Sequence, residues 1–161
     1  MALQPLDQSA RVFRLVSHTP EHFPSGADKP HPEAFRLTDD DHNDAKTRGI
    51  PPLFSVYDAS KTTTTQARAI RKAQADETGR ALPEMTPFEL LVSGIRTVSV
   101  PRPLAPLDVV SDPEDPKWGP GSEGHSGITG LEGKPGTPNL KLLLRQLRSD
   151  LRDLCMPMNE T

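Results

Sequence analysis

The sequence has little of several features that usually reveal the class of a protein. It holds one cysteine, Cys155, which excludes an internal disulfide framework and indicates a reducing compartment. It has no apolar run of about 18 residues, which excludes a transmembrane helix, and its first residues do not form a signal peptide. We therefore expect a cytoplasmic protein without membrane contact. A net charge of −3 argues against broad nucleic-acid binding but leaves room for a local basic stripe.

Apolar residues are also scarce, at 34%, and aromatic residues make up only 4% of the chain. Proline is abundant, with 18 residues among 161. These values predict a small core and much irregular chain in one domain. We expect an N-terminal arm at residues 1–9, a single domain at 10–155 and a tail at 156–161. The predicted fold class is α+β, a small and mostly antiparallel sheet flanked by two or three helices, with long proline-rich loops.

Alternating and β-branched segments predict the strands. They lie at residues 10–16, 33–37, 53–57 and 95–100, with a further short strand at 107–110 and one after the glycine-rich loop. The core residues expected from these segments and the helices are Phe13, Leu15, Leu53, Phe54, Val56, Leu90, Leu91, Ile95, Val98 and Ile128.

Capping signals predict four helices. Thr38 precedes three aspartates and the segment ends at Gly49, and a second helix starts at Thr64 or Thr65 and ends at Gly79. A threonine followed by proline predicts two more helices, at 86–94 and from Thr137 to residue 155.

The last helix carries two parallel stripes. Five leucines spaced by four and three residues form an apolar seam, widened by Leu143. Beside it lies a basic flank, which we define as Lys141, Arg145, Arg148 and Arg152. The seam must be covered by the sheet of this chain or by another chain. The flank suits an acidic protein partner, although it is equally typical of a solvated face on a core-packing helix.

A glycine-rich segment at 119–136 surrounds one histidine, His125. A histidine there could act as a general base, or it could simply hold the loop by hydrogen bonds to the backbone. Arg14, Arg36 and Tyr57 lie on predicted strands and could clamp a phosphate or carboxylate together, or they could face solvent. These four residues are weak catalytic candidates, and the sequence does not decide whether the chain is an enzyme.

No cofactor or metal is expected. The sequence has no nucleotide-binding Gly-Lys-Ser/Thr loop and no Gly-x-Ser-x-Gly turn. His18 and His22 are separated by Pro20, which disfavours the helix that would bring them together, and helix capping explains the aspartates at 39–41 and Asp44.

The order VFRL, AFRLTDDD, LFSVYD and GHSGITGL, followed by an amphipathic helix, resembles an uncharacterised family of short bacterial proteins. The resemblance spans most of residues 11–155. It implies a bacterial, cytoplasmic, single-domain protein and carries no activity to this chain.

Two functions fit these observations. The first is a non-enzymatic interaction or accessory module that binds a protein partner through the last helix and the adjoining loops. The alternative is a small enzyme or toxin-like effector acting on a phosphorylated or nucleotide substrate through His125 and the strand arginines. The oligomeric state is not predicted.

Overall fold

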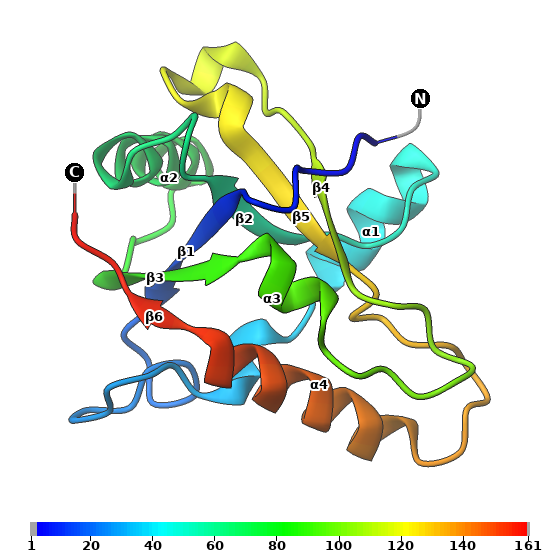
Figure 1. Cartoon of the computed structure of the whole chain (residues 1–161). Coiled ribbons are helices and arrows are strands. Elements are labelled where there is room, and N and C mark those ends of the chain that lie inside the picture. The colour runs from blue at the N-terminus through cyan, green and yellow to red at the C-terminus, as the bar shows by residue number, and fades with distance from the viewer. Residues whose placement is uncertain (1–2, 161) are drawn as a thin grey trace.

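The computed structural model describes residues 3–160 and contains a six-stranded antiparallel sheet with helices on both faces (Figure 1). The strand order is β4-β5-β2-β1-β3-β6. The strands are β1 (Arg11–Ser17), β2 (Phe54–Asp58), β3 (Met85–Leu91), β4 (Asp108–Ser111), β5 (His125–Thr129) and β6 (Met156–Pro157). The helices are α1 (Asp39–Arg48), α2 (Thr64–Thr78), α3 (Val92–Arg96) and α4 (Leu140–Leu154), with 3-10 turns η1 (Pro32–Phe35), η2 (Pro116–Trp118) and η3 (Ser122–Gly124). The predicted α+β class with a small antiparallel sheet is confirmed.

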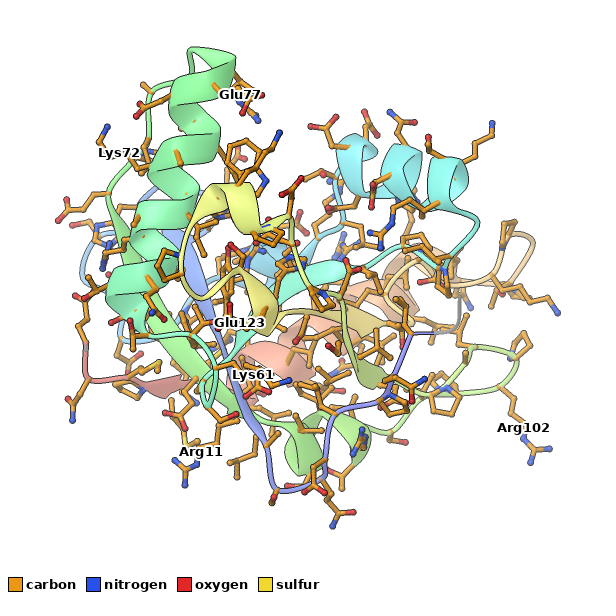
Figure 2. All side chains as sticks on the ribbon, turned by 90° about the horizontal axis from the view of Figure 1, so that it is seen from above. Arg11, Lys61, Lys72, Glu77, Arg102 and Glu123 are labelled. Carbon is orange, nitrogen blue, oxygen red and sulfur yellow. The ribbon has the colours of Figure 1, made fainter. Side chains whose placement is uncertain are left out.

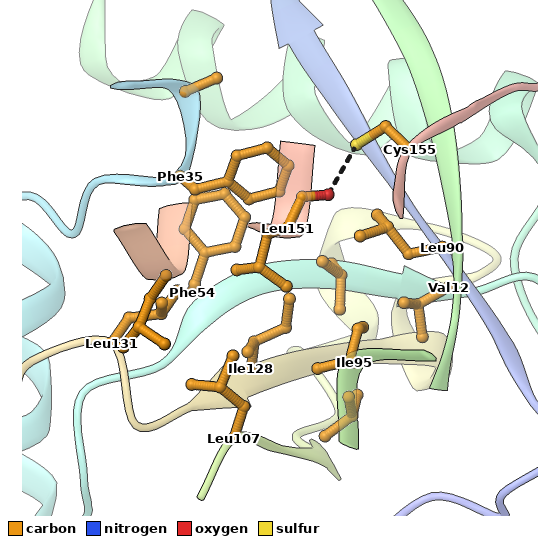
Figure 3. Close-up of a cluster of buried hydrophobic side chains, with 14 of the residues drawn as sticks. Val12, Phe35, Phe54, Leu90, Ile95, Leu107, Ile128, Leu131, Leu151 and Cys155 are labelled. Carbon is orange, nitrogen blue, oxygen red and sulfur yellow. Dashed lines mark hydrogen bonds between the residues drawn. The ribbon is translucent and has the colours of Figure 1, made fainter. Parts of the chain in front are cut away.

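The two faces of the sheet bury separate apolar clusters. Side chains of α3, α4 and η1 cover the larger cluster, in which Phe35 packs against Phe54 and Leu151 lies above the sheet (Figure 3). On the opposite face, α2 places Ala67 and Ile70 over a smaller cluster. The alternation of β1 feeds both clusters, because Val12 and Val16 belong to the larger one and Phe13 and Leu15 to the smaller. Of the predicted core residues, all are buried except Leu91, which is exposed, and Val98, which is half-buried.

Local capping chemistry determines the limits of two of the predicted helices, α1 and α2. Thr38 and Asp41 form a capping box at the start of α1, and Gly49 ends this helix with φ of 66°. Thr63 and Gln66 form the same motif in front of α2, which ends at Gly79 with φ of 69°. The predictions of both helices are confirmed.

The helix predicted at 86–94 is wrong, because its first part is strand β3. Residues 85–91 pair with β1 over seven positions, from Ser17↔Met85 to Arg11↔Leu91. The alternating burial of Met85, Phe88 and Leu90 suits this pairing better than the helical signal of Thr86 and Pro87. The strand predicted at 95–100 is also wrong, since its first two residues complete the short helix α3, which ends at Arg96.

Two further local predictions are corrected. Residues 33–37 are not a strand, because Pro32 starts the 3-10 turn η1 and His31 caps it by accepting from the N–H of Glu33. Thr137 does not cap α4; its hydroxyl donates to the carbonyl of Lys134 in the preceding turn. The cap position of α4 is occupied by Asn139 with φ of 57°, and within the described chain no side chain caps this end.

Residues near both ends of the chain extend the sheet. Pro5 bridges Val110, and the N–H of Leu6 donates to the carbonyl of Val109, so the N-terminal arm runs along β4. At the other edge, β6 pairs with Phe88 and Glu89 of β3. Among residues 3–160, none of the helices has the length and apolar character needed to cross a membrane.

Candidate functional site

Arg14 lies where the two central strands separate. The ladder between β1 and β2 holds the pairs Val12↔Asp58 and Phe13↔Tyr57, and beyond it Nη1 of Arg14 donates to the carbonyl of Ser55 at 2.8 Å. The guanidinium carbon lies 4.1 Å from the centre of the Phe54 ring, so this ring covers one face of the cation. Burial, and after it the nearby charge of Arg71, lower the pKa of Arg14 to about 9 against smaller opposing effects of Asp41 and Tyr57. The sheet therefore holds a partly desolvated cation between two strands.

Arg14 and Arg36 line the same pocket, as the sequence analysis suggested they could. The pocket lies between β1, the loop before η1 and the start of α1, and His22 also lines it. Its other lining residues are Glu21, Glu33, Ala34, Leu37, Thr38 and Asp39. In the described chain, neither His125 nor Tyr57 is among them. We call this space the Arg14 pocket.

Glu33 connects the Arg14 pocket to the basic flank of α4. One of its carboxylate oxygens lies 3.5 Å from Nη1 of Arg36, and the other lies 3.5 Å from Nη1 of Arg148. Burial lowers the pKa of Arg148, and the charges of Arg36 and Arg145 lower it as well, while Glu33 opposes them. The guanidinium groups of Arg36 and Arg148 therefore share one carboxylate, and the charge of Arg145 acts on Arg148. No local pattern predicts this arrangement, because Glu33 and Arg148 are 115 positions apart in the sequence.

The basic flank is not uniformly exposed. Lys141 and Arg145 are open to solvent, whereas the side chain of Arg148 is only 15% exposed. The Nε atom of Arg152 is buried and, within residues 3–160, has no hydrogen-bond partner, although it lies 3.5 Å from a carboxylate oxygen of Asp153. Only the first half of the flank is thus free to meet a partner without rearrangement. Leu142, beside it, is 62% exposed.

His125 starts strand β5 and is held by the segment that precedes the glycine-rich loop. Its Nδ1 lies 2.8 Å from the carbonyl oxygen of Asp112 and 3.6 Å from a carboxylate oxygen of the same residue. Because a carbonyl can only accept, this Nδ1 carries the proton and donates. Its side chain is 12% exposed. This hydrogen bond connects the start of β5 to Asp112, and it leaves Nε2 as the ring nitrogen without that bond.

Tyr57 lies against His125 but takes part in a different network. The two rings meet edge to face at 5.6 Å, and the Tyr57 hydroxyl donates to Glu114 at 3.0 Å. Glu114 also accepts from the side-chain amide of Gln74 on α2 at 2.6 Å. Burial, followed by the charge of Glu114, raises the pKa of Tyr57 above its usual range. The phenol is therefore held neutral as a hydrogen-bond donor.

The segment at 112–114 joins the two helices on either side of it. Arg48 of α1 forms two hydrogen bonds to the Asp112 carboxylate, at 2.5 and 3.1 Å, while Glu114 receives Gln74 of α2. Figure 2 shows α1 and α2 standing apart with the chain around η2 and η3 between them. Asp112, Glu114 and Arg48 were missed by sequence reasoning because nothing in their local pattern distinguishes them from ordinary surface charges.

The predicted site residues thus fall into two groups. Arg14 and Arg36 line one pocket, which Glu33 connects to Arg148 of the basic flank, while His125 and Tyr57 lie in the network of Asp112 and Glu114. Among residues 3–160, no three His, Cys, Asp or Glu side chains gather as a set of metal ligands. Comparisons of the chain with protein-family models, with curated proteins and with solved structures found no match.

Proposed function

We propose that the chain is an interaction module that binds an acidic protein partner through the exposed part of α4 and the adjoining turn η1. One observation carries this proposal: Arg36 and Arg148 share the single carboxylate of Glu33, and the charge of Arg145 also acts on Arg148. Because Glu33 is the one carboxylate within ion-pair distance of these arginines among residues 3–160, the surface keeps an excess of positive charge in a protein whose net charge is negative. An acidic surface would relieve the repulsion among these cations.

The exposed side chains of α4 suit a partner that is both acidic and apolar. Leu142 and Arg145 are three residues apart, and Lys141 and Arg145 are four apart, so these three side chains share one side of the helix. A leucine exposed between two cations offers a small apolar contact with charged neighbours. This pattern fits an amphipathic segment bearing Asp or Glu side chains.

The packing of the leucine seam indicates that a partner would contact the basic flank and not the seam. Leu147 and Leu151 are buried in the larger cluster, and Leu140, Leu143, Leu144 and Leu154 pack against it while remaining partly exposed. The seam therefore covers this chain's own sheet. What remains for a partner is the outer side of the first turns of α4.

A charge reversal at the two exposed cations tests the proposal. The variant Lys141→Glu with Arg145→Glu should bind a fluorescently labelled hexaglutamate peptide at least about tenfold more weakly than the original chain at low salt, measured by anisotropy. Binding by the original chain should weaken as salt is added, because exposed charges are screened. Arg148 is left unchanged, since a glutamate there would face Glu33 and disturb the fold.

The matched control reverses two cations elsewhere, Lys61→Glu with Arg102→Glu. Both residues are exposed, and Figure 2 shows Arg102 projecting away from the body of the protein. Each double variant changes the net charge by the same amount. Equal weakening by both would show that the peptide responds to net charge alone, and the proposed interface would be wrong.

The enzyme alternative has less support from the geometry. It needs His125 to act beside Arg14 or Arg36, and in the described chain the pocket that contains both arginines is lined without His125. The hydrogen bond from His125 to the carbonyl of Asp112 gives the histidine a structural role that needs no substrate.

A further inference from the structure

The Arg14 pocket contains a cation that the protein does not neutralise. Within residues 3–160, no carboxylate lies within ion-pair distance of the Arg14 guanidinium, whose one hydrogen bond goes to the Ser55 carbonyl. A carbonyl and an aromatic ring compensate a buried cation only in part. An arginine held in this way is preorganised for an anion that enters from the pocket.

Two nitrogens of the Arg14 guanidinium, Nε and Nη2, have no hydrogen-bond partner among residues 3–160. In the described chain, the only fully buried side-chain nitrogen or oxygen atoms without a hydrogen-bond partner are Oε2 of Glu132 and Nε of Arg152. The Nε and Nη2 atoms of Arg14 are not among them, so neither atom is fully buried. Because Phe54 covers one face of the guanidinium and Arg14 lines the pocket, an anion in the pocket can approach this side chain.

We infer that the Arg14 pocket binds a carboxylate group, which Arg14 receives at the base and Arg36 at the rim. A guanidinium matches a carboxylate with two parallel hydrogen bonds. The remaining charges of the pocket decide between carboxylate and phosphate. Glu33 is shared by Arg36 and Arg148, but Glu21 and Asp39 are exposed at the rim and repel an anion in proportion to its charge. A carboxylate carries one negative charge, whereas a phosphate monoester carries nearly two at neutral pH.

The source of the carboxylate follows from the neighbouring surface and rests on the proposed function. Glu33 both lines the pocket and contacts Arg148, so an acidic partner lying along α4 can insert one Asp or Glu side chain towards Arg14. A side chain desolvated in this way is typical of the few contacts that dominate a protein interface. The other source is a free carboxylic acid, which would reach the same atoms.

Titration with small anions tests the pocket without any partner. Sodium acetate should produce saturable shifts of the Arg14 side-chain Nε–H signal in NMR spectra, beyond those caused by sodium chloride at equal ionic strength. The variant Arg36→Ala should weaken acetate binding by about tenfold, because one charge-assisted contact is lost. The control is Arg11→Ala, a change on β1, the strand that also carries Arg14. The two replaced arginines match in their surroundings, because the Arg11 side chain is 61% exposed, that of Arg36 is 67% exposed, and each forms an ion pair with one glutamate.

The possible results separate clearly. Saturable acetate shifts that weaken in Arg36→Ala but not in Arg11→Ala support the inference. Absence of saturation, equal weakening in both variants, or tighter binding of sodium phosphate than of acetate overturns it. Should Arg14→Gln be needed as a direct test, its fold must first be checked by circular dichroism, because this variant also loses the Ser55 contact.

The inference and the proposed function can fail separately. Lys141 and Arg145 do not line the described pocket, so their reversal should leave acetate binding unchanged. If the chain binds acetate but not hexaglutamate, the pocket binds a free carboxylic acid, and the proposal of an acidic protein partner is wrong. Weaker hexaglutamate binding by Arg36→Ala, again without loss in Arg11→Ala, identifies a peptide side chain as a source of the carboxylate.

Discussion

Leu151 offers the sharpest test of whether α4 belongs to the core of this chain. Its side chain is 0% exposed and lies in the larger apolar cluster. Burying a leucine contributes about 1.5–3 kcal/mol, and the cavity left by Leu151→Ala should bring the loss in unfolding free energy to about 2–5 kcal/mol. In a domain of this size, a loss of about 3 kcal/mol lowers the melting temperature by about 6–12 °C.

The experiment compares Leu151→Ala with Leu142→Ala by urea unfolding and thermal melts. Both changes delete the same atoms from the same helix, so differences in helix propensity cancel. Leu142 is 62% exposed, and its replacement should change stability by no more than about 0.5 kcal/mol. Equal effects, or a loss below about 1 kcal/mol for Leu151→Ala, would mean that the seam is not covered by this chain's own sheet.

Two further predictions concern buried ionisable groups. Tyr57 is the single tyrosine, and burial raises its pKa, so it should remain neutral in the folded protein when the pH passes about 10. In the unfolded chain this tyrosine ionises at about pH 10. The stability that the neutral phenol contributes below about pH 10 is therefore lost as the pH rises further. Tyrosinate absorbance, with folding followed by Trp118 fluorescence, checks this, and half-ionisation near pH 10 in folded protein would contradict it. Burial raises the pKa of the Cys155 thiol to about 12, so it should react slowly with a disulfide reagent at pH 8 and rapidly once urea unfolds the chain. Fast, complete labelling of the folded protein would show that the thiol is accessible.

The sequence predicted those elements whose signals are local. The cap at Thr38 and the glycines after α1 and α2 act within a few residues, so both helices could be predicted, although the cap of α2 is Thr63 and lies just before the predicted start. The alternation at 10–16 and the apolar character of 53–57 likewise predicted β1 and β2, and the structure places both at the centre of the sheet. These features need no knowledge of distant residues.

The errors arose where distant pairing overrides a local signal. Thr86 and Pro87 form a good helix start, but seven ladder positions with β1 make this segment a strand. The candidate site was likewise predicted only in part. The sequence suggested that Arg14 and Arg36 could bind one anion together. It could not predict the connection to Arg148 through Glu33, because that contact forms only when η1 packs on α4. Sequence spacing alone cannot place a carboxylate between two cations that lie so far apart along the chain.

The slight burial of α1 has a consequence for the motion of the molecule. This helix has ten residues, of which only Ala45 is buried, and isolated helices of fewer than about 12–15 residues are marginal in water. The stability of α1 therefore depends on its caps and on the ion pair between Arg48 and Asp112. Amide hydrogens of α1 should exchange through local opening well before those of β1, whose neighbours pair with it on both sides. Because Thr38 and Asp39 line the Arg14 pocket, local opening of α1 would remove part of the lining of that pocket.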